Sequence, residues 1–282
     1  MRSLRIMLAI ASLALLGAAA PGPRRIVSLN LCADQLLVGL ADRTQIVALT
    51  EWARDPELSA VAAHARSIPF THRSAEEVMA LRPDLVIGAP FQTRAVLAPL
   101  KAHGVKLLDL PWSQDVAAIE AAITTLAAAV GHPERGARMI AQMRRALASV
   151  GPPPGRGRVA AYYQRQGYLT GTGTLVDEMF RRVGLVNLAA RLGRPALSQL
   201  SLEEMALARP DFLILESGTR AVADRGTAAL HHPVLDTAIP AARHLYIEQA
   251  QTVCGSPAFA AAVASLAAQI RAIDRREGVG GR

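Results

Sequence analysis

The sequence is poor in cysteine, lysine and aromatic side chains, and each shortage excludes a class of protein. Its 282 residues contain 2 cysteines and no Cys-x-x-Cys or His-x-x-x-His spacing, which argues against a disulfide-rich scaffold and a zinc site. Lys101 and Lys106 are the only lysines, so arginine carries almost all of the positive charge. Aromatic residues make up 4%, too few for a surface that stacks on nucleic-acid bases. The net charge of +8 comes from arginines that stand singly or in pairs between acids, and we expect no nucleic-acid partner.

Long apolar runs are missing after residue 20, where no segment approaches the roughly 18–20 residues that cross a bilayer. Before it, Arg2 and Arg5 precede an apolar stretch from Ile6 to Leu16, and small residues follow as far as Ala20. Positive residues, a short apolar stretch and small residues, in this order, are typical of a secretory signal peptide. The stretch is short for a membrane anchor. We therefore expect residues 1–21 to be a signal peptide and the mature chain to be a soluble monomer of the periplasm.

Hydrophobic residues make up 51% of the chain, enough to bury a sizeable core, and their pattern predicts alternating strands and helices. Helical segments separate short apolar runs, so we expect parallel sheets in an α/β fold. The strands are expected at residues 25–29, 46–49, 84–88, 105–110, 159–164, 211–216 and 243–248.

The middle of the chain marks the boundary between two domains. Residues 114–130 and 134–150 read as consecutive helices, and the segment GPPPGRG that follows is the clearest breaker in the sequence. The sequence therefore predicts an N-terminal lobe over residues 22–113, connecting helices over 114–150 and a C-terminal lobe over 151–282.

An internal repeat supports two lobes of similar architecture. Residues 74–87 read SAEEVMALRPDLVI, and residues 201–215 read SLEEMALARPDFLIL. Ordinary signals for helix start and helix stop explain the residue types. They explain the matched lengths and the shared Arg-Pro-Asp less well.

These segments also carry a resemblance to a known family. Together with RIVSLNLCADQLLVGL, IVALTEW, YLTGTGTLVDEMFRRVGLVNLA and CGSPAF, the two repeats make the chain similar to periplasmic binding proteins for ferric siderophores and cobalamin over about residues 24–275. Those proteins are the solute receptors of ABC importers. The resemblance implies two Rossmann-like lobes with parallel sheets, joined by a long backbone helix that permits little hinge motion. It also implies that Glu76 and Glu203, one on each lobe, dock to the membrane permease.

The ligand implied by the resemblance is a small-molecule metal chelate, bound between the lobes with no resident cofactor and no metal held by the protein itself. Ligands of α/β sheets lie beyond the carboxyl ends of the strands, which directs attention to the loops there. Rigid aromatic faces suit a bulky chelate, and arginines suit an anionic one. The candidate cleft residues are Trp52, Phe91, Arg94, Trp112, Tyr163, Arg165 and Tyr168.

Several alternatives stay open. The two tryptophans can instead cap the lobe cores, and the arginines can be solvated surface charges. A siderophore is slightly favoured over cobalamin, with haem as a third candidate. A receptor for bare zinc or manganese is a weaker interpretation, because such a site needs several His and carboxylate side chains that converge on one cleft. An exported chelatase-like enzyme is also weaker, because no catalytic motif is present, and we expect no enzyme. Cys32 and Cys254 are either a disulfide or two cleft thiols.

Overall fold

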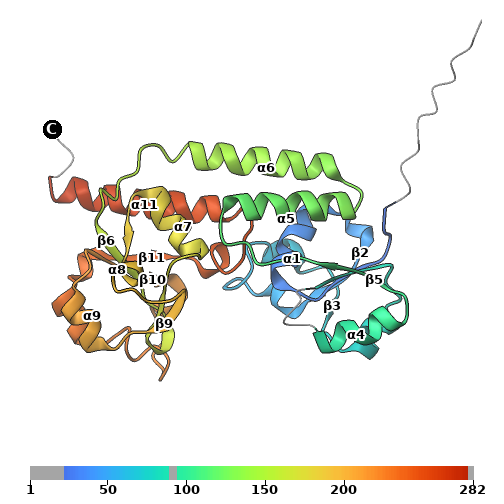
Figure 1. The fold of residues 1–282 in the computed structure, drawn as a ribbon, viewed down its shortest axis with the longest axis horizontal. Helices are drawn as coiled ribbons and strands as arrows, with labels where there is room; N and C mark the ends of the chain where they lie inside the picture. The colour runs from blue at the N-terminus through green and yellow to red at the C-terminus, as the bar shows by residue number, and fades with distance from the viewer. Residues whose placement is uncertain (1–21, 89–93, 279–282) are drawn as a thin grey trace, which may run out of the picture.

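The structure is a computed structural model and describes residues 22–88 and 94–278. Two α/β lobes lie side by side, with long helices along one edge of the molecule (Figure 1). This confirms the predicted fold class. The predicted signal peptide and the candidate cleft residue Phe91 lie outside the described residues.

The N-terminal lobe is built on a five-stranded sheet in the order β3-β2-β1-β4-β5, in which every pairing is parallel. Its three middle strands are almost wholly buried, which explains their continuous apolar sequence. The elements of this lobe are β1 (Ile26–Ser28), α1 (Leu31–Leu40), β2 (Ile46–Thr50), α2 (Ala62–Ala65), β3 (Phe70–Thr71), α3 (Ala75–Ala80), β4 (Leu85–Gly88), α4 (Arg94–Ala102) and β5 (Lys106–Asp109).

The C-terminal lobe has a parallel sheet in the order β11-β10-β6-β8 and a small antiparallel pair, β7 and β9. Its elements are β6 (Val159–Tyr162), β7 (Tyr168–Thr170), α7 (Leu175–Val183), β8 (Val186–Asn187), α8 (Leu188–Arg191), β9 (Leu197–Gln199), α9 (Leu202–Ala208), β10 (Phe212–Glu216), α10 (Pro233–Ala238), β11 (His244–Ile247) and α11 (Phe259–Arg276).

The sequence repeat occupies equivalent places in the two lobes. Ser74 caps α3 and Ser201 caps α9, each accepting a hydrogen bond from the backbone N–H three residues on. Beyond the helices, Arg82 and Arg209 both adopt a positive φ, at 44° and 41°. The shared Arg-Pro-Asp therefore forms the same turn twice.

The aspartate of each repeat also makes the same kind of hydrogen bond, to backbone N–H groups. Asp84 accepts hydrogen bonds from the backbone N–H groups of Arg24 and Arg25, just before β1. Asp211 accepts one from the N–H of Val159, at the start of β6. Each aspartate thus ties its repeat to the first strand of its own lobe.

Two helices connect the lobes: α5 (Val116–Ala129) and α6 (Pro133–Ala148). Helix α6 packs on α5 and α1 and also on α11, so it touches elements of both lobes (Figure 1). Gly136 allows the close approach of α5, because a β-carbon there would stand 2.6 Å from that of Ala127. One continuous hydrophobic cluster runs through both lobes and these helices. No helix within residues 22–88 and 94–278 has the length and apolar character to cross a membrane.

Candidate ligand-binding cleft

Three adjoining cavities lie between the lobes, beyond the carboxyl ends of the strands. The first has a volume of about 260 Å³ and shares Trp112, Ser113 and Val253 with the second, of about 350 Å³. The second shares Glu216 and Gln249 with the third, of about 410 Å³. Because both lobes contribute residues to each cavity, the three form one interlobe cleft.

Two indoles line the first cavity from the N-terminal lobe. Trp112 follows β5 and is 71% exposed, and Trp52 follows β2 and is 38% exposed. The guanidinium of Arg73 lies 3.7 Å from the centre of the Trp52 ring and is ion-paired to Glu51 at 2.6 Å. This stacking covers one face of Trp52 and fixes the ring. The exposed Trp112 provides a large apolar surface that the protein itself does not cover.

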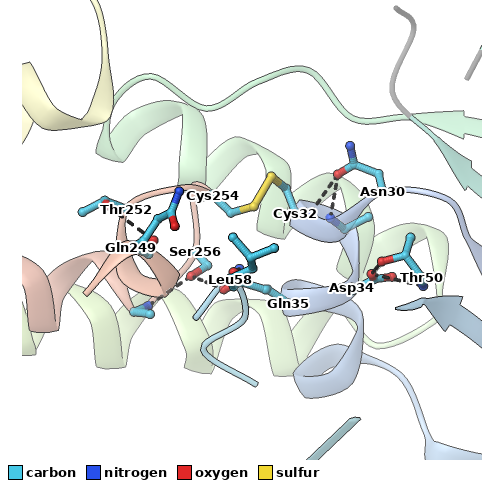
Figure 2. The surroundings of a disulfide bond; sticks show 12 residues. Asn30, Cys32, Asp34, Gln35, Thr50, Leu58, Gln249, Thr252, Cys254 and Ser256 are labelled. Carbon is cyan, nitrogen blue, oxygen red and sulfur yellow. Dashed lines mark hydrogen bonds between the residues drawn. A yellow bond between two sulfur atoms is a disulfide. The ribbon is translucent and has the colours of Figure 1, made fainter. Parts of the chain in front are cut away.

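A disulfide joins the lobes at the wall of the same cavity (Figure 2). Cys32, in the first turn of α1, is bonded to Cys254 of the C-terminal lobe, with their Cα atoms 5.0 Å apart. Gln35 accepts a hydrogen bond from the hydroxyl of Ser256 one turn further along α1, at 3.2 Å. Where the sequence left two possibilities for the cysteines, the structure pairs them and so ties the lobes together on one side of the cleft.

The wall opposite carries a polar network at the ends of β6 and β10. These strands are adjacent and form the point where the strand order of the sheet reverses, which is where ligands of open α/β sheets bind. The hydroxyl of Tyr162 donates to Oε1 of Glu216 at 2.9 Å, and Nε2 of Gln164 donates to the same oxygen at 3.0 Å. Burial, together with the Glu216 carboxylate, raises the pKa of Tyr162 well above its usual value. Tyr162 therefore stays protonated as the donor.

Two of the predicted cleft tyrosines lie elsewhere. Tyr163 is 1% exposed, packs in the hydrophobic cluster on the other face of the sheet and donates its hydroxyl to the carbonyl of Leu200, so its assignment to the cleft is wrong. Side chains alternate along a strand, and this places Tyr162 instead of Tyr163 at the cleft. Tyr168 begins β7 and lines none of the three cavities within the described part of the chain.

The predicted pair of clamping arginines is only partly described. Arg94 is the first residue of α4, and its side chain lies outside the description. Arg165 lines the third cavity, where its guanidinium is ion-paired with Asp224 at 2.7 Å and holds the pKa of that carboxyl below its usual value. The charge of Arg165 is thus already compensated within the protein.

Carboxylates outnumber arginines on the described walls of the cleft. Glu57 reaches the third cavity from the N-terminal lobe, and Glu216 and Glu248 line it from the C-terminal lobe. None of these three glutamates was expected in the cleft from the sequence. Glu216 ends the buried strand FLILE, and a charged residue at the end of such a run was the signal that could have identified it. Among the described residues, no group of three or more His, Cys, Asp and Glu is placed to hold a metal ion.

Glu76 and Glu203 occupy equivalent positions in the first turns of α3 and α9, and both are exposed. The next residue of each repeat is engaged within the chain: Glu77 accepts the backbone N–H of His72, and Glu204 closes a capping box and pairs with Arg194. No hydrogen bond or ion pair involves the side chain of Glu76 or Glu203 in the described part of the protein. Each copy of the repeat therefore presents one exposed carboxylate that has no hydrogen-bond or ion-pair partner among the described residues.

Two parallel-sheet lobes, a shared backbone helix and a cleft between strand ends define the class of two-lobed solute-binding proteins. The chain belongs to the periplasmic binding protein family, whose model matches residues 26–247. Proteins of this family are solute receptors that act outside the cytoplasm and deliver ligands to ABC transporter permeases.

Three relatives illustrate the range of ligands. A cobalamin-binding protein of Halobacterium salinarum is 25% identical over 197 residues, which are 68% of this chain and 53% of that protein. The chain therefore spans about half the length of the curated relatives it matches. The structure of a periplasmic haem-binding protein from Roseiflexus sp. RS-1 superposes with a TM-score of 0.68 at 25% identity, covering 89% of this chain and 99% of that one. An Fe3+-hydroxamate transport protein from Saccharomonospora viridis superposes with a TM-score of 0.66 at 22% identity, covering 91% and 94%.

Proposed function

We propose that this protein captures a metal chelate in the periplasm and delivers it to an ABC importer, without covalent chemistry. The observation that carries the proposal is the interlobe cleft, with a largely exposed indole and a second indole fixed by Arg73 on one wall. Flat aromatic faces beside a few oriented polar groups are what a bulky planar ligand requires. The chelate is the cargo, so the protein needs no cofactor of its own.

The candidate ligands are cobalamin, haem and a ferric hydroxamate siderophore, as the printed names of the relatives suggest. The described cleft offers aromatic surface and hydrogen-bonding groups, and its arginine is neutralised by Asp224. This supports a neutral chelate rich in amides, such as cobalamin, more than the anionic siderophore that the sequence slightly favoured.

A fluorescence titration of the mature chain, residues 22–282, tests this function. Trp52 and Trp112, the only tryptophans, both line the first cavity, so a bound chelate that absorbs light should quench most of the emission. We expect saturable quenching by cyanocobalamin, haemin or a ferric hydroxamate at micromolar or lower concentration. A response to zinc alone would indicate a bare-metal receptor, and no response from a folded sample would contradict the proposal.

We further propose that Glu76 and Glu203 dock the receptor to its permease. Exposed carboxylates without an internal partner are available to arginines of another protein, and such charge pairs mainly set orientation and encounter rate. The double variant Glu76→Ala/Glu203→Ala should bind the chelate normally and fail to support uptake in cells. Glu134→Ala, which removes an exposed carboxylate from α6, is the matched control. Normal uptake by the double variant would refute docking through these residues.

A further inference from the structure

We propose that Glu216 is a specificity-determining residue of the cleft and accepts a hydrogen bond from a ligand N–H, such as a primary carboxamide. The inference deepens the proposed function and rests on it. Glu216 ends β10 at the reversal of strand order, is 5% exposed, and lines both the second and the third cavity. A carboxylate held this far from water needs partners, and the described residues supply them to only one of its two oxygens.

The internal partners all meet at Oε1. Tyr162 and Gln164 both donate to that oxygen, at 2.9 and 3.0 Å. The amide of Gln164 cannot turn round without loss, because its own oxygen accepts the hydroxyl of Thr170 at 2.9 Å. The network therefore fixes the orientation of the carboxylate before any ligand arrives.

The second oxygen, Oε2, has no hydrogen-bond partner among the described residues, although Glu216 lines two cavities. A charged acceptor that is oriented and mostly removed from water forms strong hydrogen bonds with a donor and repels another carboxylate. Glu57 and Glu248, on the walls of the adjoining third cavity, add further negative charge to that of Glu216. Arg165 does not offset it, because Asp224 neutralises that side chain.

This arrangement should give the candidate chelates different affinities according to their peripheral substituents. A ligand that presents carboxamide N–H groups satisfies Oε2, whereas one that presents a carboxylate at the same place brings two negative charges together. The structure thus assigns to Glu216 the preference for a chelate with peripheral carboxamides over a chelate of the same shape with peripheral carboxylates.

A matched ligand pair tests the assignment. The dissociation constant of the mature protein is measured for cyanocobalamin and for derivatives in which one peripheral carboxamide at a time is replaced by a carboxylate. We expect at least one derivative to bind about tenfold or more weakly, as the loss of a charge-assisted hydrogen bond requires. In Glu216→Gln the gap for that derivative should shrink to about threefold or less, because the new amide can donate to the carboxylate. Glu134→Gln should keep the wild-type gap.

Equal binding of all derivatives by the wild type, or an unchanged gap in Glu216→Gln, would overturn the role of Glu216 while leaving the receptor function intact. If the protein takes haem instead of cyanocobalamin, the same logic predicts that its dimethyl ester binds better than haem, and a preference for free haem would overturn the assignment. Failure to bind any of these chelates would refute the proposed function and the inference with it. Equal binding of all derivatives by the wild type would overturn the role of Glu216 even where Glu216→Gln does not fold.

Discussion

Trp112 places an indole in solvent in a chain where aromatic residues make up only 4%. The side chain contributes little to the core because 71% of it stays exposed. A chelate bound at the proposed site would bury apolar surface that folding leaves exposed.

We expect Trp112→Ala to raise the dissociation constant of the chelate about tenfold or more, since a buried aromatic anchor contributes roughly 1–2 kcal/mol or more to binding. The free energy of unfolding should change by less than about 0.5 kcal/mol. Titration and urea denaturation measure the two quantities. Leu207→Ala is the control: that leucine, on α9 away from the cleft, is 84% exposed, and its removal should affect neither. An unchanged affinity in Trp112→Ala would remove this residue from the site.

Asp34 is a second residue whose chemistry is set by burial. It lies on α1, two residues beyond the disulfide, and its Oδ2 accepts the hydroxyl of Thr50 at 2.6 Å (Figure 2). Its Oδ1 is buried and has no hydrogen-bond partner within residues 22–88 and 94–278. Burial raises the pKa of Asp34 from 3.8 to about 7, although Ser28, Thr50 and the charge of Arg73 oppose the rise.

This pKa makes the stability of the fold fall as pH rises from about 4 to about 7. In that range the folded protein keeps a proton on Asp34 that the unfolded chain releases, so each pH unit costs up to about 1.4 kcal/mol. We expect the free energy of unfolding of the wild type to fall between pH 5 and pH 7 relative to that of Asp34→Asn, which has no proton to lose. Urea denaturation at both pH values measures the difference. Parallel pH profiles for the two proteins would show that Asp34 is ionised in the fold throughout.

The repeated Ser-x-Glu-Glu segment shows how local sequence determines where a helix begins. Ser201 and Glu204 form a reciprocal capping box at α9, whereas Ser74 caps α3 through its hydroxyl. Both helices are short, so the caps satisfy a large share of their unpaired backbone N–H groups.

We expect Ser201→Ala to lower the free energy of unfolding by about 1 kcal/mol, the usual value of an N-cap hydrogen bond. Chemical denaturation measures this change. Thr125→Ala, an exposed hydroxyl deletion inside α5, should not lower the free energy of unfolding, because alanine is the better helix former. Equal stability of Ser201→Ala and Thr125→Ala would show that the capping box contributes nothing measurable.

The long elements were predictable because their apolar periodicity and end signals agree. Asn30 stands just before an apolar stretch, which is a typical N-cap signal, and its side chain accepts the N–H groups of Cys32 and Ala33. Gly184 follows directly after α7 and ends it in the left-handed conformation, as a glycine at this position usually does. The two- and three-residue strands β3, β7, β8 and β9 were not expected, because such short pairings are set by the neighbouring sheet and loops more than by their own sequence.

The candidate site was harder to predict than the fold. The loops after the strands were identified, and Trp52, Trp112 and Arg165 do line the cavities. Successive side chains of a strand point to opposite faces of the sheet. An error of one residue therefore placed Tyr163 in the cleft, where the structure has Tyr162. The pairing of Cys32 with Cys254 depends on a distance between lobes that no local pattern encodes.

For the whole molecule, the disulfide and the continuous core make the two lobes one unit. Cys32 and Cys254 are 222 residues apart in sequence, so their bond closes most of the described chain into a loop. Gly255 lies directly against Ser113, where any β-carbon would collide, which shows how closely the lobes approach beside the bond. Large opening of the cleft would have to break these contacts.

We expect the double variant Cys32→Ser/Cys254→Ser to lower the free energy of unfolding by about 2–5 kcal/mol, because the unfolded chain regains the entropy of a very long loop. Thermal denaturation of the oxidised wild type, the reduced wild type and the variant measures the loss. The reduced wild type should behave like the variant. Identical melting of all three would show that the bond does not stabilise the fold.

The proposed binding site lies between the lobes, with Trp52 and Trp112 on one side and the ends of β6 and β10 on the other. The most direct measurement is a crystal structure of the mature protein grown with the chelate that quenches its fluorescence, recorded at the absorption edge of the bound cobalt or iron. We expect one strong anomalous peak inside the interlobe cleft. A peak on an outer face of either lobe, with the cleft empty of ligand, would contradict it.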